Sequence, residues 1–455
     1  MSPAISFDLE SPELSFTASG GALVSRTIHP SGLRILSESV PGALSTSIGF
    51  WVAVGSRDEE SVAYGSTHFL EHLLFKGTPR RNALDIAIAF DQVGGEHNAL
   101  TAKEHTCYYA KVQDHDLPMA IEVLADMVAS SVLDPKEFEI ERGVILEELA
   151  MADDDPSDVA HERLTEIVLR NHALGRPIGG HADTINASTR DSVMEHYRRY
   201  YHPHELVVTA AGAVDHADLV EHVICGLELA GWDLKNSRPP VPRRSQAPAV
   251  LDTSPQSLVV TRPLEQAVVA LATHGLRATD ERRPALSILS SVLGGGMSSR
   301  LFQEIRERRG LAYSVYSFAS SYADAGMFGM AAGTSPSHAS EVAKLMKAEL
   351  EAIASEGITS DELERTKGNI AGSSALALES SDARMMRLGR SEISTAEFVD
   401  RDEALARLST VGLADIQSLA SEFLSTPLSA VVVGAVKDGI VDDVVGGTVT
   451  VASPA

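Results

Sequence analysis

Two histidines and a glutamate lie within five residues of one another in the stretch "STHFLEHLLFKGT", residues 66–78. His68 and His72 are four residues apart, so on a helix both imidazoles project from one face and reach one metal ion at about 2.0 to 2.1 Å. Glu71 directly precedes the second histidine, where it is badly placed to bind the same ion but well placed to accept a proton from a water on that ion. The order His-x-x-Glu-His reverses the familiar zinc helix and is typical of a hydrolase.

The competing interpretation is that these are polar residues on an ordinary packed helix. With 16 His in 455 residues, the pattern is expected by chance only about 0.04 times per chain, so context decides between the two. A catalytic zinc also needs a third protein ligand and an open position for water.

Candidates for the third ligand lie in the acidic stretch "EIERGVILEELAMADDDP", residues 139–156, which predicts a helix. Glu141 and Glu148 are seven residues apart and therefore share a helix face, whereas Glu147 points about 100° away from Glu148. We expect Glu148 to be the ligand and Glu141 to orient one of the histidines.

The chain also contains an internal repeat. The block "LDPKEFEIERGVI", 133–145, matches "ITSDELERTKGNI", 358–370, at a constant offset, and an amphipathic helix is predicted before each copy. At this offset Glu148 falls on Ser373, and the second half has no histidine pair, because "SVLGGGMSSR" stands at its corresponding helix. Only the first half therefore carries the predicted ligands.

Elements that position these residues follow from the hydrophobic pattern. Segments 33–40 and 45–56 alternate apolar and polar residues with period two and predict strands on either side of a Pro-Gly turn. A hairpin is predicted at 96–112, with Thr106, Tyr108, Ala110 and Val112 on one face. Strands, helices and hairpins in this order indicate an α+β fold with a mostly antiparallel sheet, occurring twice.

A proline- and arginine-rich stretch, "NSRPPVPRRSQAPAV" at 236–250, interrupts the periodic pattern and predicts a linker. The predicted organisation is an N-terminal zinc-binding domain at 1–235 and a homologous domain without metal at 251–455.

Composition limits the partners and the compartment. The net charge of −25 argues against nucleic acid and anionic lipid as partners. It favours cationic ligands, such as a basic peptide, if the charge is focused in a cavity, and solubility alone is the alternative explanation of the charge. No apolar run is long enough to span a bilayer, and the N-terminal stretch up to Ser25 contains no Lys or Arg, so no secretory or transit signal is expected. Two cysteines, Cys107 and Cys225, suit a reducing compartment. A cytoplasmic protein without a membrane segment is the expectation.

Two further patterns predict no separate site. The segment "LGGGMSSRLF", 293–302, lacks the Gly-Lys-Ser/Thr ending of a phosphate loop. His97, His105 and Cys107 lie close in sequence, but we do not expect a second metal site from side chains spread over a hairpin.

The residues above resemble the inverted-zinc-motif metallopeptidases that include pitrilysin, insulin-degrading enzyme and the mitochondrial processing peptidase. The similarity is greatest to bacterial processing-peptidase-like members of about this length. It rests on the segments "HFLEHLLFKGT", "VGGEHNALTAKEHTCYYAKV", "ERGVILEEL" and "GGGMSSRLFQEIRERRGLAYSVYS", and on the spacing between His72 and Glu148, which the family shares.

This resemblance implies one Zn2+ per chain on His68, His72 and Glu148, with Glu71 as general base and Glu141 in support. It also implies that a strand holding Asn98, Ala99 and Leu100 binds an extended peptide by strand addition. In the second half, the resemblance assigns Arg306 and Tyr313 to the substrate backbone and the oxyanion.

By the same resemblance, the chain is half of what single-chain members use to enclose a chamber, so two chains are expected to assemble. A homodimer fits because one chain holds both residue sets, and a heterodimer is the alternative. The expected activity is zinc-dependent endopeptidase cleavage of extended peptides or N-terminal segments. Maturation of a peptide-derived cofactor is a narrower alternative, and a non-catalytic core subunit is the alternative from another class.

Overall fold

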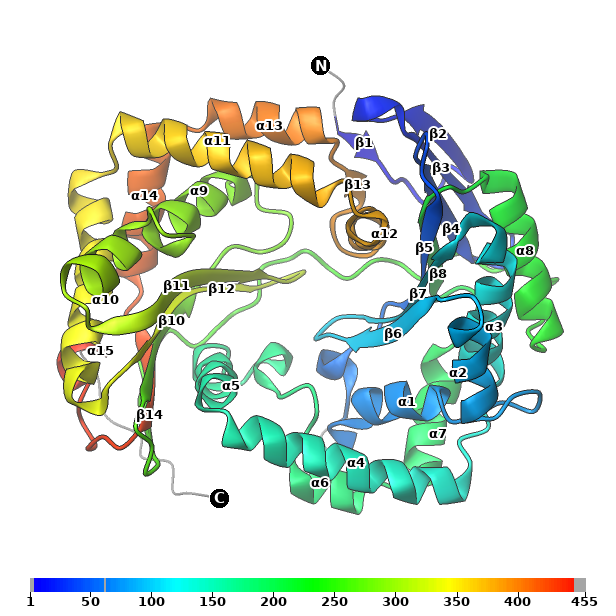
Figure 1. The fold of residues 1–455 in the computed structure, drawn as a ribbon, viewed down its shortest axis with the longest axis horizontal. Coiled ribbons are helices and arrows are strands. Elements are labelled where there is room, and N and C mark those ends of the chain that lie inside the picture. The colour runs from blue at the N-terminus through cyan, green and yellow to red at the C-terminus, as the bar shows by residue number, and fades with distance from the viewer. Residues whose placement is uncertain (1–3, 61–62, 446–455) are drawn as a thin grey trace. The chain divides into compact units, whose positions relative to one another are not determined.

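The computed structural model describes residues 4–60 and 63–445 as helices and strands joined by loops (Figure 1). The chain divides into two compact units, each assembled from three segments. Unit 1 contains the residues up to Leu149, then 177–244 and 374–403, and unit 2 contains 150–176, 245–373 and the residues from Ala404 onward. Each unit combines a mostly antiparallel sheet with helices, which confirms the predicted α+β class and its repetition.

The sheet of unit 1 has seven strands in the order β2-β3-β4-β8-β5-β7-β6, and all neighbours are antiparallel except β4 and β8. The predicted strands at 33–40 and 45–56 are β4 and β5, and the predicted hairpin is β6 and β7. The strands are β2 Glu13–Thr17, β3 Leu23–Ile28, β4 Arg34–Ser39, β5 Ser45–Val52, β6 Glu96–Thr101, β7 Thr106–Gln113 and β8 Leu206–Gly212, with a small ladder of β1 Ile5–Ser6 and β13 Glu397–Phe398.

Both faces of this sheet are covered. Tyr108 and Ala110 of β7 enter a core with the apolar faces of α1 and α3, whereas Cys107 enters a second core with Trp51 of β5 and Met385 of α12. Successive residues of β7 are buried for this reason, and the hairpin face predicted from Thr106, Tyr108, Ala110 and Val112 is fully buried as well.

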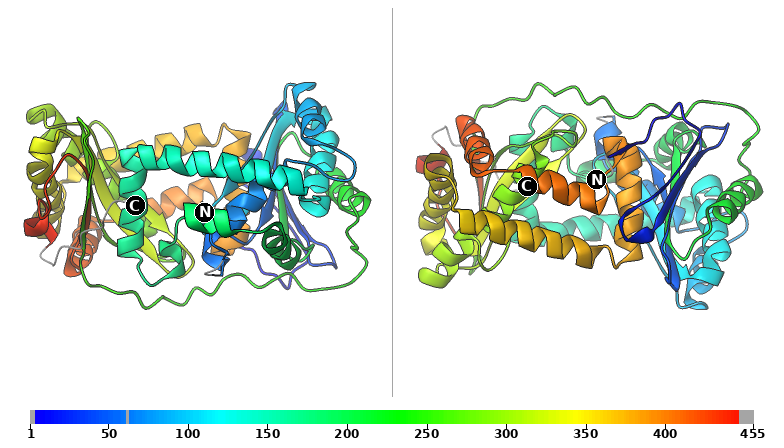
Figure 2. Two further views of the ribbon diagram at one scale, coloured as in Figure 1. Left: turned by 90° about the horizontal axis from the view of Figure 1, so that it is seen from below. Right: turned by 90° about the horizontal axis from the view of Figure 1, so that it is seen from above.

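The helices of unit 1 lie between and beside these strands. They are α1 Ser66–Leu74, α2 Ala83–Asp91, α3 Leu117–Ser130, α4 Pro135–Asp154, α6 Ala182–Ala187, α7 Arg190–Tyr200, α8 His216–Leu229 and α12 Ser381–Arg390, followed by the short π-helix η8 Ser391–Thr395. Residues 139–154 of the predicted acidic helix lie in α4, whereas Asp155 and Pro156 follow its end. Helix α4 is one continuous helix (Figure 2), although its last residues count with unit 2.

The sheet of unit 2 repeats this topology in five strands, ordered β11-β12-β10-β14-β9. Its single parallel pair, β9 and β14, corresponds to β4 and β8 of unit 1. The strands are β9 Ser257–Thr261, β10 Ala267–His274, β11 Ala312–Ser321, β12 Gly326–Thr334 and β14 Ser429–Gly434. The helices are α5 Pro156–Val168, α9 Arg283–Gly294, the π-helix η6 Phe302–Arg308, α10 Ala339–Glu356, α11 Ser360–Ala377, α13 Arg401–Thr410, α14 Leu413–Ser425 and α15 Asp442–Val445, of which α11 and α13 begin or end in segments of unit 1.

The two halves of the chain exchange one helix. Helix α5 follows α4 in the first half, yet it packs on β10 and β14 of unit 2. Helix α12 stands at the corresponding place in the second half, after α11, and packs on β4, β5 and β8 of unit 1. The compact units are therefore discontinuous in sequence, and the domain ranges 1–235 and 251–455 stay a prediction about the sequence repeat.

The proline-rich segment 236–250 contains no helix or strand. Two of its arginines bind residues of unit 1: Arg243 contacts the buried carboxylate of Glu392 at 2.7 Å, and Arg244 pairs with Asp58. In the described part of the chain, no helix has the length and apolarity that a membrane crossing requires.

Candidate metal centre

Helix α1 starts at a tightly defined point. Gly65 precedes it with φ of +92°, a left-handed conformation that favours glycine, and a Cβ there would lie 2.6 Å from Ile185 Cδ1. The buried carboxylate of Glu59 accepts hydrogen bonds from the backbone N–H groups of Gly65 and Thr67 at 2.8 and 2.7 Å. These bonds satisfy otherwise free N–H groups at the helix start and place a negative charge at the positive end of the helix.

The apolar face of α1 is buried through Phe69, Leu70, Leu73 and Leu74. This burial leaves the partly exposed face of the helix to His68, Glu71 and His72. The spacing predicted from the sequence is therefore realised, with both imidazoles on one side of the helix.

Glu148 of α4 completes a three-residue group. Its Oε2 lies 3.4 Å from His72 Nε2 and 3.8 Å from His68 Nε2, and the ligand atoms of the three residues all lie within 4.8 Å of one another. Two ligands that bind zinc tetrahedrally at about 2.1 Å are about 3.4 Å apart. Two nitrogens and one carboxylate oxygen at this spacing fit a catalytic zinc with one open position.

Glu141 fixes the orientation of His72. Its carboxylate is 2% exposed, accepts the Nδ1–H of His72 at 3.0 Å and pairs with Lys76 Nζ at 2.5 Å. With the proton on Nδ1, the lone pair on Nε2 faces Glu148, which is the tautomer that a metal ligand requires. Sequence reasoning missed Lys76; its position four residues after His72 was the available signal.

His68 is held in its neutral form. Burial, together with the neighbouring His72, lowers the pKa of His68 to about 4. Its Nδ1 is buried without a hydrogen-bond partner among the residues that the structure describes. Gly179 passes close to this ring, since a Cβ on Gly179 would lie 3.9 Å from His68 Nδ1 and 3.0 Å from Leu149.

Glu71 lies beside the group without being part of it. Burial raises the pKa of its carboxyl, and this effect is opposed by hydrogen bonds from Thr101 and by the nearby His72. The hydroxyl of Thr101 donates to Glu71 Oε2. Sequence reasoning did not single out Thr101, because nothing local distinguishes it from other hairpin threonines.

Asn98, Ala99 and Leu100 lie on β6, which is an edge strand of the sheet of unit 1. Ala102 N–H donates to the His105 carbonyl at 2.8 Å, and alternation along the ladder then directs the N–H and C=O of Ala99 to the free edge. In agreement, Ala99 N–H bonds to the side-chain oxygen of Asn98 at 2.8 Å instead of to β7. The edge is thus available for strand addition at Ala99.

Arg306 and Tyr313 come together in unit 2. Arg306 lies on the π-helix η6, and its guanidinium carbon is 4.6 Å from the ring centre of Phe302 and 4.7 Å from that of Tyr313. A bulge between Ala312 and Ser314 shifts the register of β11 at Tyr313, whose side chain is 81% exposed. Bulges and π-turns both redirect side chains and are frequent at functional sites.

His97, His105 and Cys107 do not gather. His97 stacks on Phe90 with ring centres 4.4 Å apart, while the ring centre of His105 lies 5.4 Å from that of Trp51. Within the described residues, His68, His72 and Glu148 form the one group of His, Cys, Asp or Glu side chains whose spacing suits a metal ion.

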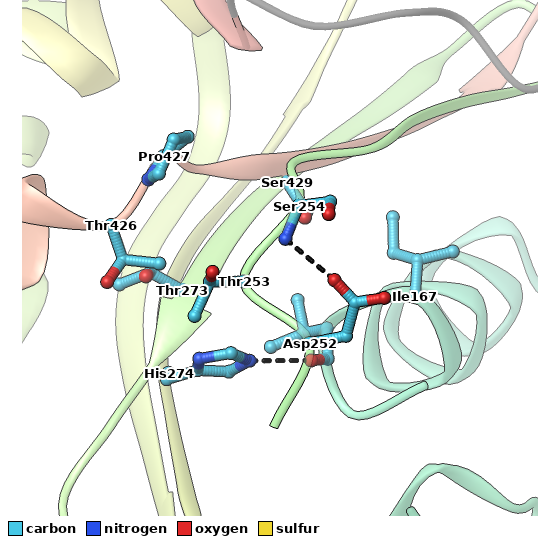
Figure 3. Close-up of a pocket in the computed structure, with 10 residues that line it drawn as sticks. Ile167, Asp252, Thr253, Ser254, Thr273, His274, Thr426, Pro427 and Ser429 are labelled. Carbon is cyan, nitrogen blue, oxygen red and sulfur yellow. Dashed lines mark hydrogen bonds between the residues drawn. The ribbon is translucent and has the colours of Figure 1, made fainter. Parts of the chain in front are cut away.

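A shallow recess in unit 2 contains none of the predicted site residues (Figure 3). Its polar groups are used internally: Asp252 accepts from Ser254 N–H at 2.9 Å, and His274 Nε2 bonds to the Val168 carbonyl at 2.9 Å (Figure 3). These bonds tie the recess wall together.

Two sequence models of known families match the chain. One, described as insulinase, peptidase family M16, covers residues 34–182, and the other, described as the peptidase M16 inactive domain, covers residues 187–370. The first range includes the whole predicted metal group, and the second includes Arg306 and Tyr313.

Curated relatives align over almost their full length. An uncharacterized zinc protease of Streptomyces coelicolor is 47% identical over 92% of this chain and 91% of its own length. Uncharacterized zinc proteases of Mycobacterium tuberculosis and Bacillus subtilis are 44% and 37% identical, over 90% and 89% of this chain and 92% and 96% of their own lengths.

Solved structures share the fold. A protease from Helicobacter pylori superposes with a TM-score of 0.81 at 24% identity, covering 93% of this chain and 99% of the other. A peptidase M16 inactive domain from Pseudomonas fluorescens gives a TM-score of 0.80 at 18% identity, with coverage of 93% and 98%.

Proposed function

The chain belongs to peptidase family M16, and from this premise we propose that it is a zinc metalloendopeptidase that cleaves extended peptides or N-terminal segments. The observation that carries the proposal is the convergence of His68, His72 and Glu148, while Glu71 lies beside them outside the ligand set. A structural carboxylate cluster has no need of two histidines on one helix face, one of them oriented by a hydrogen bond to Glu141. The names of the relatives support zinc as the metal.

Zinc in this site supplies Lewis acidity, which lowers the pKa of a water molecule and polarises the scissile carbonyl. Glu71 accepts the proton of the attacking water as the new bond from oxygen to the carbonyl carbon forms. It then passes the proton to the amine nitrogen as the carbon–nitrogen bond breaks. Burial of Glu71 favours this double role, because it raises the pKa of the carboxyl and so makes the carboxylate a better proton acceptor than an exposed glutamate.

Arg306 and Tyr313 act on the substrate backbone and the oxyanion in this proposal. Both offer donors, and the two aromatic rings that flank the Arg306 guanidinium pre-organise it. The free edge at Ala99 binds the peptide by main-chain hydrogen bonds, with Asn98 and Leu100 beside it. Such binding captures extended chains without reading their sequence in detail.

The assembly in this proposal is a homodimer that encloses a peptide chamber, with a heterodimer as the alternative. His68, His72 and Glu148 lie in unit 1, and Arg306 and Tyr313 lie in unit 2 of the same chain. Two identical chains therefore carry two complete sets of these residues. The net charge of −25 favours basic peptides as substrates through long-range attraction. A cytoplasmic location and one zinc per chain complete the proposal.

The alternative role as a non-catalytic core subunit predicts degraded ligands, whereas the described residues retain all three ligands and Glu71. Maturation of a peptide-derived cofactor is a special case of the same chemistry, and substrate profiling separates it from general peptide cleavage.

The decisive experiment pairs metal analysis with cleavage of a mixed peptide library. Glu71→Gln is expected to retain zinc and lose cleavage, because the amide keeps the shape of the side chain but cannot take the proton. Glu147→Gln is the matched control, since Glu147 is an exposed residue of α4. Parent-like cleavage by Glu71→Gln, or parent protein without stoichiometric zinc and without cleavage, contradicts the proposal.

A further inference from the structure

Glu71 accepts a hydrogen bond from Thr101, the last residue of β6, which is the strand proposed to bind the peptide. Thr101 ends β6, is 8% exposed, and donates its hydroxyl hydrogen bond to Glu71 Oε2. The backbone N–H of Thr101 adds a second hydrogen bond to the same carboxylate. The proton acceptor of α1 and the peptide-binding strand are thus joined directly, although the two residues lie on separate elements of the chain.

We propose that Thr101 is a positioning residue that holds the Glu71 carboxylate against the end of β6, so that the proton acceptor keeps a fixed place relative to a bound peptide. This inference rests on the proposed function, because it needs Glu71 to act as the base and β6 to bind the substrate.

The register of β6 supports this role. Along the free edge, the outward main-chain groups belong to every second residue, which includes Ala99 and Thr101. The outward N–H of Thr101 donates a hydrogen bond to Glu71. Among the described residues, the outward N–H of Ala99 donates to the side chain of the adjacent Asn98, which a peptide can displace. A peptide added to this edge therefore bonds at Ala99, and its ladder stops at Glu71.

This register also places the scissile bond. Ala99 and Thr101 are two residues apart, which is about 7 Å along a strand. The peptide bond on the Thr101 side of the residue paired with Ala99 then lies beside Glu71. Thr101 therefore holds Glu71, the proposed base, beside the peptide bond that is to be cleaved.

Thr101 is itself held by a clamped turn. Ala102 and Lys103 accept backbone hydrogen bonds from Ser56 and Arg57 at 3.2 and 3.0 Å. Gly55 allows this approach, since a Cβ there would lie 2.3 Å from the Ala102 carbonyl oxygen. The end of β6 is consequently tied to the chain before α1.

Ion pairs hold the other side of the same turn. Arg57 binds Glu104 at 2.5 Å, and Arg244 bonds to the Glu104 carbonyl at 3.2 Å while it pairs with Asp58. A threonine on such a fixed backbone has a stiff χ1, whereas glutamate has three rotatable bonds, so the hydroxyl restricts Glu71 and not the reverse.

The test compares Thr101→Val, Thr101→Ser and Thr106→Val in the full-length protein. Valine keeps the shape of threonine but lacks the donor, and serine restores the donor. Thr106 is the matched control, because it lies opposite Thr101 on β7, is fully buried, and donates to the Val54 carbonyl at 3.0 Å instead of to Glu71.

For Thr101→Val we expect kcat for peptide cleavage to fall about 10- to 100-fold, the cost of a base displaced by about 1 Å. KM should stay within about 3-fold of the parent, because the binding edge is intact. Bound zinc, measured per chain, should not change. Thr101→Ser should return kcat to within about 3-fold of the parent, and Thr106→Val should leave kcat near the parental value.

A parental kcat in Thr101→Val overturns the inference, as does an equal loss of kcat in Thr106→Val or no rescue by serine. A crystal structure of Thr101→Val provides a readout that needs no activity: Glu71 should adopt a different rotamer, and an unmoved Glu71 also overturns the inference. If the parent cleaves no peptide, the proposed function fails, and the rotamer of Glu71 in Thr101→Val then shows separately whether Thr101 positions this carboxylate.

Discussion

His72 Nε2 lies 3.4 Å from Glu148 Oε2, although the two side chains belong to different helices that are far apart in the sequence. The opposite edge of the same imidazole, Nδ1, bonds to Glu141 at 3.0 Å. Helix α4 therefore supplies both a proposed ligand, Glu148, and the carboxylate of Glu141 that orients another proposed ligand, His72. This double dependence on α4 makes the metal centre sensitive to changes far from the histidine motif.

Replacing Glu148 should remove the metal. We expect the parent to purify with about one zinc per chain and Glu148→Gln to lose most of it, because two neutral histidines alone hold zinc weakly. Metal analysis after dialysis against a weak chelator measures the difference. Glu147→Gln, an exposed neighbour on α4, should retain zinc, and equal loss in both variants would contradict the assignment of Glu148.

Replacing Glu141 should weaken zinc binding without abolishing it. Glu141→Gln removes the charge that accepts from His72 and pairs with Lys76, and loss of such a partner typically costs about 10- to 100-fold in metal affinity. Competition with a fluorescent chelator gives the affinity. Glu139→Gln is the control, since Glu139 is exposed on the same helix and pairs with Arg142. An unchanged affinity in Glu141→Gln would show that the carboxylate does not support His72.

Mixing two inactive variants tests how the proposed homodimer shares its sites. Glu71→Gln and Arg306→Ala should each cleave poorly. If Arg306 serves the metal group of its partner chain, random mixing should restore about one quarter of parental activity, because half of the dimers are mixed and each carries one complete site. Glu71→Gln mixed with Arg308→Ala provides the reference, since Arg308 is 72% exposed and bonds to Glu304.

Mixed samples that stay inactive, while Arg306→Ala retains zinc and dimerises, would assign Arg306 to its own chain. Parental activity of Arg306→Ala alone would remove this residue from the proposed mechanism.

Stability should fall as the pH falls from 6.5 toward 4, in part because of His196. Burial lowers the pKa of His196 to about 4 from the ordinary value of 6.5. Within this window the unfolded chain binds a proton that the folded chain does not, so the free energy of unfolding decreases as the pH decreases, by at most about 1.4 kcal/mol per pH unit for this group. Urea unfolding at a series of pH values should show a shallower dependence for His196→Gln. The exposed His222→Gln on α8 should keep the parental dependence, and identical curves for parent and His196→Gln would refute the prediction.

The sequence alone was enough to predict which side chains of the candidate site share a helix face. His68, Glu71 and His72 share a helix face because helical periodicity depends only on spacing, and the same holds for Glu141 and Glu148. The internal repeat and the two antiparallel sheets were also predictable, since both depend on patterns within short segments. These features needed no information about which segments pack together.

Only the tertiary structure decided the contacts between segments. Thr101 binds Glu71, Lys76 pairs with Glu141, and Glu59 holds the start of α1. The exchange of α5 and α12 between the units is also invisible in the sequence repeat. The hydrophobic pattern of each helix shows which of its faces is buried, but not which sheet covers that face. Spacing along the chain fixes which side chains share a face, whereas their partners depend on long-range packing of faces that many segments could cover.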